Sequence, residues 1–251
     1  MSELRSFETA RRVRLGDATS GGRLRFDGLA RYLQDIAADD TEDAHMPGDR
    51  GWILRRMDLD VGRLPAVYED VILTTWCSGV GSRWAERTTT LSGIDGLDES
   101  RTALAHGVLV TARAVWVNID LDSGSPRSLP PEFFAAYGDE IREHPVSARL
   151  KHPRPGPQAV RGPWPVRSTD FDVFGHVNNA VYWSAIEERL EACRTGRRVR
   201  GAEIEFRGGV DPGDACELVT HSVDDALWIW FAVAGDVRAS AVVHLDEASD
   251  S

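Results

Sequence analysis

The sequence predicts an α+β fold in which one structural unit, a long helix followed by an antiparallel sheet, occurs twice. Each half of the 251-residue chain contains apolar residues at helical spacing, and several strand-like segments follow them. A stretch rich in proline and glycine separates the two halves. Because a helix with one apolar stripe must bury it against another element, each half can form its own core.

The first half has the clearer helical pattern. Leu29, Tyr32, Leu33 and Ile36 are spaced as on one face of a helix. The strand-like segments that follow cover residues 53–61, 70–79, 83–92 and 104–120. We therefore expect a first domain over residues 1–144.

The second half repeats the order of the first. Residues 145–165 are rich in proline and contain no core-forming pattern, so we expect a linker there. A second helix is expected over residues 179–194, and strands over 202–207, 215–222, 227–234 and 237–245. The second domain would thus cover residues 166–251.

Composition excludes several classes of protein. A net charge of −11 disfavours a general nucleic-acid binder. No apolar run approaches the ~18 residues of a membrane span, and the first 14 residues are too polar for a secretory signal. Three widely spaced cysteines argue against a disulfide framework or a metal site and fit a reducing cytoplasm. We expect a cytoplasmic protein without a metal or another cofactor.

The segment 169–183 contains the residues most suited to chemistry. Asp170, Asp172 and His176 precede the second helix, and Asn178 or Asn179 is suited to cap it. Unpaired N–H groups at a helix N-terminus favour negative charge. A carboxylate, an imidazole and oxyanion-binding N–H groups would then lie close together, which suits acyl transfer to water. The alternative, a loop whose polar residues merely cap a helix, stays open at this point.

Several motifs resemble those of a known family. The pattern Asp-x-Asp-x-x-Gly-His-Val-Asn-Asn, starting at Asp170 and followed by an aromatic pair, is similar to the signature of hotdog-fold thioesterases. The first half adds motifs at residues 52–60, 75–79, 114–118 and 126–130. Their succession resembles the acyl-acyl-carrier-protein thioesterases of plants and bacteria over roughly residues 7–245. The resemblance implies a tandem hotdog fold, and an enzyme that hydrolyses fatty acyl-carrier protein to free fatty acid and carrier protein.

The resemblance also implies roles for individual residues. It places the catalytic aspartate at Asp172 and the catalytic histidine at His176. Where the family has an asparagine between them, this chain has Phe174, and the Glu-Cys pair of the plant enzymes falls on Gly209-Val210. The sequence does not decide whether Asp172 acts as a nucleophile or as a general base.

Neighbouring residues are expected to support this site. Asn178 and Asn179, at the start of the helix, would support the oxyanion, and Asp170 would brace the loop. Residues 19–23, the first-half counterpart of the motif, have neither the aspartate nor the histidine in register. We therefore expect one active site per chain and an acyl pocket in the first half, shaped by Leu29 and Leu33 on the inner face of its helix.

Two other functions remain open from the sequence. One is an acyl-CoA thioesterase, and the other is a non-catalytic acyl-binding or regulatory protein, which Phe174, Gly209 and Val210 favour. The acyl chain length and a homodimer also remain open.

An acidic carrier protein would dock on basic residues. Two clusters qualify, one of Arg194, Arg197, Arg198 and Arg200, and one of Arg149, Lys151, Arg154, Arg161 and Arg167.

Overall fold

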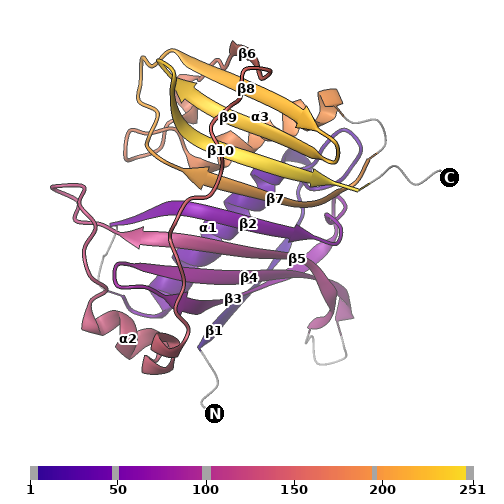
Figure 1. Ribbon diagram of the computed structural model, residues 1–251. Helices are drawn as coiled ribbons and strands as arrows, with labels where there is room; N and C mark the ends of the chain where they lie inside the picture. Colours follow the sequence, from indigo (N-terminus) through magenta and orange to yellow (C-terminus); the bar gives the residue numbers. More distant parts are fainter. Residues whose placement is uncertain (1–4, 47–50, 98–102, 194–196, 247–251) are drawn as a thin grey trace. The chain divides into compact units, whose positions relative to one another are not determined.

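The computed structural model describes residues 5–46, 51–97, 103–193 and 197–246 (Figure 1). The chain divides into two compact units, Met1–Arg149 and Leu150–Ser251. The division predicted from the sequence, with a separate linker over residues 145–165, stays a prediction.

The first unit packs a long helix against an antiparallel sheet. The sheet contains β1 (Ser6–Arg12), β2 (Trp52–Val61), β3 (Asp70–Val80), β4 (Trp84–Leu97) and β5 (Ala103–Asn118). These strands pair antiparallel in the order β1-β3-β4-β5-β2. Helix α1 (Phe26–Asp43) lies against one face of this sheet (Figure 1). Leu29, Leu33 and Ile36 of α1 are buried, as their spacing predicts.

Shorter elements complete the first unit. A 3₁₀ turn, η1 (Leu15–Asp17), precedes α1. After the sheet come helix α2 (Pro131–Tyr137) and the 3₁₀ turn η2 (Asp139–Glu143). Aromatic residues of α2 form a small core with β3 and β4, in which Phe133 lies 4.9 Å from Tyr137 and 5.6 Å from Phe134 between ring centroids.

The second unit repeats the plan of the first. Helix α3 (Asn179–Cys193) is followed by β7 (Val199–Phe206), β8 (Cys216–Val223), β9 (Ala226–Val233) and β10 (Asp236–Leu245). With β6 (Val160–Pro163), these strands pair antiparallel in the order β7-β10-β9-β8-β6. Tyr182 of α3 packs edge-on against Phe206 and Phe231, at centroid distances of 5.2 and 4.9 Å.

All eight strands expected from the sequence are present within a few residues of the predicted limits. Much of the predicted linker, however, packs on the second unit. Residues Val160–Pro163 form β6, which pairs with β8, and the Trp230 indole donates to the Pro153 carbonyl at 2.8 Å. Within the same stretch, His152 is buried in a coil segment, where its Nδ1 lies 3.1 Å from Ser240 Oγ.

Candidate functional site

Asp170 forms hydrogen bonds with the backbone at both ends of the motif loop. It ends a 3₁₀ turn, η3 (Ser168–Asp170), and its Oδ2 accepts the N–H of Arg167 at 2.7 Å. Its main-chain carbonyl accepts the N–H of Asn178 at 2.9 Å. Both hydrogen-bonding groups face the loop's own backbone, so Asp170 fixes the loop that contains Asp172 and His176.

Asp172 begins a tight turn that returns the chain to His176. Its main-chain N–H donates to the His176 carbonyl at 2.9 Å, and its own carbonyl accepts the N–H of Gly175 at 3.0 Å. Gly175 has φ 79°, a conformation that glycine adopts without steric cost. Asp172 Oδ1 accepts the N–H of Phe174 at 2.9 Å. This bond orients the half-buried carboxylate, and Oδ2 receives no hydrogen bond from any described residue.

The imidazole of His176 pairs with a carboxylate that the sequence analysis did not identify. His176 Nδ1 lies 2.7 Å from Asp211 Oδ1, across 35 residues of chain. A carboxylate only accepts hydrogen bonds, so Nδ1 carries the proton of this pair and Nε2 faces away from Asp211. The side chains of His176 and Asp211 are 54% and 63% exposed, so substrate and water can reach them.

The two asparagines have different positions at the start of α3. Asn178 is the N-cap, because its Oδ1 accepts the N–H of Ala180 at 2.9 Å. The N–H of Asn178 itself is bonded to Asp170, whereas the N–H of Asn179 has no acceptor among the described residues. Of the two predicted oxyanion donors, Asn179 therefore has the available backbone N–H group.

Two of the three departures from the family pattern have clear structural positions. Phe174 is 58% exposed at the tip of the loop, where its backbone rather than its ring contacts Asp172. Val210 is only 1% exposed and is a core residue, and its carbonyl accepts the N–H of Val177 at 3.1 Å.

A neutral phenol lies near the two carboxylates. Burial raises the pKa of the Tyr182 hydroxyl, and the nearby Cys216, Asp172 and Asp211 raise it further, whereas Arg238 lowers it. Tyr182 is therefore uncharged at neutral pH. It adds apolar surface to this region but no further charge.

The first unit encloses a cavity of about 540 Å³ between α1, the sheet and α2. It is lined by Gln34, Ala37, Ala38, Thr41, Glu42, Met46, Trp52, Cys77, Ala85, Glu86, Arg87, Trp116, Phe133 and Tyr137. Leu29 and Leu33 are buried elsewhere along α1 and do not line this cavity. The α1 residues that do line it lie between Gln34 and the C-terminal end of the helix and include two alanines.

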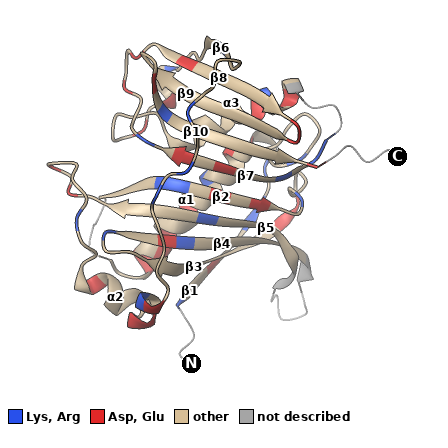
Figure 2. Ribbon diagram, viewed as in Figure 1, with Lys and Arg blue, Asp and Glu red and all other residues tan. Residues whose placement is uncertain are grey.

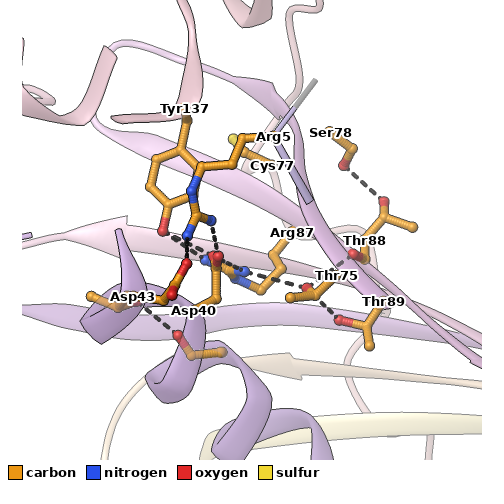
Figure 3. A network of polar contacts seen from close by, with 12 residues as sticks. Arg5, Asp40, Asp43, Thr75, Cys77, Ser78, Arg87, Thr88, Thr89 and Tyr137 are labelled. Atoms are coloured by element: carbon orange, nitrogen blue, oxygen red, sulfur yellow. Dashed lines mark hydrogen bonds and ion pairs between the residues drawn. The ribbon is translucent and has the colours of Figure 1, made fainter. Parts of the chain in front are cut away.

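A buried polar network borders this cavity (Figure 3). Asp40 is fully buried, and its Oδ2 lies 2.6 Å from Arg87 Nη1 and accepts the Tyr137 hydroxyl at 3.0 Å. Its Oδ1 accepts a hydrogen bond from Arg5. The network joins β1, α1, β4 and α2, so the charged groups hold these elements around the cavity.

The two predicted basic clusters differ in their ion pairs. Figure 2 shows basic and acidic residues interspersed over both units. In the first cluster, Arg194 lies outside the described residues, Arg198 pairs with Asp246 at 3.2 Å, and Arg200 with Asp225 at 2.9 Å. In the second cluster, four exposed residues have no ion pair with any described residue: Arg149 in the first unit, and Lys151, Arg154 and Arg167 in the second.

No group of three or more His, Cys, Asp and Glu side chains in the described ranges could hold a metal ion. No helix in the described part of the chain is both long enough and apolar enough to cross a bilayer.

Comparison with known proteins identifies the family. Residues 5–137 match the acyl-ACP thioesterase N-terminal domain, and residues 156–241 match the acyl-ACP thioesterase C-terminal domain. The chain is also 27% identical over 239 residues to the uncharacterized protein Rv2001 of Mycobacterium tuberculosis, which covers 95% of this chain and 91% of the relative.

Solved structures share the fold over nearly the whole chain. An acyl-ACP thioesterase from Bacteroides thetaiotaomicron has a TM-score of 0.78 at 19% identity and covers 96% of this chain and 98% of its own. The 12:0-ACP thioesterase from Umbellularia californica has a TM-score of 0.78 at 15% identity, with 96% and 97% covered. A putative oleoyl thioesterase from Lactobacillus plantarum has a TM-score of 0.77 at 17% identity, with 97% of each chain covered.

These similarities confirm the predicted α+β tandem hotdog fold. The two matched domains together span both units of the chain. The chain belongs to the acyl-ACP thioesterase family, and it is a thioester hydrolase.

Proposed function

We propose that this protein hydrolyses fatty acyl-carrier protein at a site formed by Asp172 and His176, and releases free fatty acid and carrier protein. The observation that carries the proposal is the turn from Asp172 to His176 directly before α3, with a carboxylate oxygen and an imidazole nitrogen both available. Family membership supplies the reaction class, and this turn supplies the groups that the reaction needs.

In the proposed reaction, Asp172 acts as the general base. Its Oδ2 takes a proton from a water molecule as the water oxygen attacks the thioester carbon. The tetrahedral intermediate then collapses, the carbon–sulfur bond breaks, and the pantetheine sulfur leaves as a thiolate. The proton held by Asp172 passes to the thiolate, directly or through water, so that a fatty acid and a free thiol result. His176 orients the attacking water through Nε2.

The N–H of Asn179 is the proposed oxyanion donor. It lies at the N-terminus of α3, where the helix dipole favours negative charge. One such donor can stabilise a tetrahedral intermediate by ~3 kcal/mol. Since a backbone group supplies this bond, replacing the side chain of Asn179 with Ala should leave kcat within about 10-fold of wild type.

A direct attack by Asp172 on the thioester carbon is the alternative chemistry. A single turnover in H₂¹⁸O separates the two routes. With a general base, the fatty acid carries ¹⁸O from the first turnover. With a nucleophilic aspartate, an acyl–Asp172 anhydride forms, and water attack on its Asp172 carbonyl releases unlabelled acid in the first turnover and leaves ¹⁸O in the Asp172 carboxylate. Unlabelled acid together with labelled Asp172 would therefore establish the nucleophilic route.

We propose that the cavity of the first unit holds the acyl chain. Its walls include Trp52, Trp116 and Phe133, which offer apolar surface to a hydrocarbon. Ala37 and Ala38 leave space on the α1 side. Larger side chains there should therefore limit the length of chain accepted.

The proposed carrier-protein contact is the set of unpaired basic residues in the second unit. Lys151, Arg154 and Arg167 are exposed, and Arg167 lies directly before η3 and the catalytic loop. Carrier proteins are acidic, so local positive charge near the active site would guide encounter despite the net charge of −11. We further propose a cytoplasmic role in fatty-acid formation, in which this hydrolysis ends chain growth on the carrier.

The deciding experiment measures free-thiol release from acyl-carrier protein and acyl-CoA substrates over a range of chain lengths. The proposal expects a higher kcat/KM with acyl-carrier protein. A higher kcat/KM with every acyl-CoA of matched length would make the chain an acyl-CoA thioesterase. Binding of acyl groups without any thiol release would make it a non-catalytic acyl-binding protein.

A further inference from the structure

The imidazole of His176 is held from two sides by the segment that joins β7 to β8. On one side, Asp211 Oδ1 lies 2.7 Å from Nδ1. On the other side, the ring lies directly on the backbone of Gly209, where an added Cβ would come within 2.8 Å of Nδ1 and 3.0 Å of Cγ. Real Cβ atoms do not approach other atoms so closely, so only glycine at position 209 leaves the ring in this place.

The β7–β8 segment is itself fixed beside the catalytic loop. The N–H of Asp211 donates to Asp214 Oδ2 at 2.9 Å, and the Asp211 carbonyl accepts the N–H of Asp214 at 3.1 Å. The Val210 carbonyl accepts the N–H of Val177, the residue after His176, at 3.1 Å. The two bonds with Asp214 hold Asp211 within its own segment, and the bond between Val177 and Val210 joins that segment to the catalytic loop. Together they place the carboxylate of Asp211 beside the imidazole.

Stability alone does not account for this arrangement. A polar contact as exposed as that between His176 and Asp211 contributes little to folding. Its effect on the imidazole is chemically specific, because a carboxylate accepts only the proton on Nδ1. The pair therefore selects the tautomer whose Nε2 carries a free lone pair.

We infer that Asp211 is a positioning residue for His176, and that Gly209 provides the backbone surface against which the imidazole ring packs. The role rests on the proposed function, because it concerns the histidine of that site. Position 209, which matches the glutamate of the plant enzymes, is glycine here and leaves room for the ring, and a carboxylate stands two residues later, at Asp211.

The first test observes the tautomer without relying on activity. In long-range ¹H–¹⁵N spectra of the ¹⁵N-labelled full chain, loss of a signal in His176→Ala assigns the imidazole. We expect a proton on Nδ1 in wild type and a transfer of much of the population to Nε2–H in Asp211→Ala. Glu217→Ala, which removes a similarly exposed carboxylate on β8, should leave the tautomer unchanged. A wild-type Nε2–H tautomer, or no change in Asp211→Ala, would refute the inference.

The second test measures hydrolysis of acyl-carrier protein. Asp211→Ala should lower kcat by ~10- to 100-fold, the effect typical of partners that orient a functional histidine, with little change in KM. Asp211→Glu should recover part of the loss. In a His176→Ala background, Asp211→Ala should cost nothing further, because the group that it positions is gone. An equal loss in that background would overturn the positioning role.

Substitutions at two neighbouring glycines test whether the ring needs glycine at position 209. Gly209→Ala should lower kcat like Asp211→Ala, whereas Gly208→Ala should stay close to wild type, because its Cβ would meet only the mobile end of Arg238 at 3.4 Å. Equal activities of the two variants would refute this role of Gly209. A wild type that releases no thiol would refute the proposed function instead, while the tautomer measurement would still decide the role of Asp211.

Discussion

Replacing Asp40 with asparagine should destabilise the first unit far more than any change at its surface. Asp40 has no exposed surface, and its carboxylate bonds Arg5, Arg87 and Tyr137. Asp40→Asn removes the negative charge and places an N–H₂ group against two guanidinium groups. Arg87, whose side chain is only 13% exposed, is then left buried without its counter-ion.

The expected loss follows from this burial. Removing one partner of a buried ion pair costs about 3–5 kcal/mol, whereas a wholly exposed pair contributes about 0–1 kcal/mol. The free energy of unfolding of a protein is typically about 5–15 kcal/mol, so this loss is a large share of the total stability. At ~2–4 °C per kcal/mol for a chain of this size, Tm should fall by about 6–20 °C.

The matched control is Asp43→Asn. Asp43 also pairs with Arg5, but its side chain is 60% exposed, so the loss should stay below about 1 kcal/mol. Calorimetry and urea unfolding followed by tryptophan fluorescence would measure both variants. If Asp40→Asn unfolds within about 1 kcal/mol of Asp43→Asn, the network does not stabilise the unit in the way described.

Three further predictions concern pH, the partner and the pocket. Burial raises the pKa of Asp27, but the hydrogen bonds and charges of Arg25 and Arg31 outweigh it and hold that pKa below its ordinary value. Its contribution to stability is therefore present at neutral pH and lost as the pH falls below about 5, so Asp27→Asn should flatten the acid side of the stability–pH curve. Charge reversal to glutamate is expected to weaken carrier binding at the three unpaired basic residues of the second unit, Lys151, Arg154 and Arg167. KM for acyl-carrier protein should rise, the salt dependence of KM should flatten, and kcat should stay nearly unchanged. Ala37→Leu should shorten the acyl chain preferred in a competition among chain lengths, whereas Ala135→Leu, on the exposed side of α2, should not.

Each of these predictions has an outcome that contradicts it. An acid-stability curve for Asp27→Asn parallel to that of wild type would show that its ion pairs do not stabilise the fold. Arg198 and Arg200 are ion-paired, and Arg197 donates to main-chain carbonyls. Reversal of these three residues should raise KM less than reversal of Lys151, Arg154 and Arg167, and the opposite order would place the carrier contact at the first cluster. An unchanged chain-length profile in folded Ala37→Leu would place the acyl chain elsewhere.

Much of the fold follows from alternation and helical spacing in the sequence. Met57, Leu59 and Val61 alternate with polar residues along β2 and are buried, as a period of two predicts. The run Leu29, Leu33, Ile36 on α1 is also buried on one face, which its helical spacing predicts. Strand β1 was not predicted because three of its seven residues are charged, which is typical of a polar terminus. Helix α2, also seven residues, is too short for periodicity to identify.

The site was predictable only where its residues are local. Asp172, His176 and Asn178 lie within seven consecutive residues before a helix, so the loop and its cap could be inferred. Asp211 lies 35 residues from His176, and Asp40 lies 47 from Arg87, so no sequence pattern pairs them. Asp40 also sits on the buried face of α1, where a charged residue is rare unless it is paired.

The central claim is that Asp172 performs the chemistry, and one comparison tests it most directly. Steady-state hydrolysis of acyl-carrier protein by purified wild type and Asp172→Asn should show kcat lower by ~10²–10⁴ in the variant, because asparagine keeps the shape of the side chain but cannot take a proton. Circular dichroism and Tm should match, so that the loss cannot be assigned to unfolding. Near-normal turnover by folded Asp172→Asn would contradict the account.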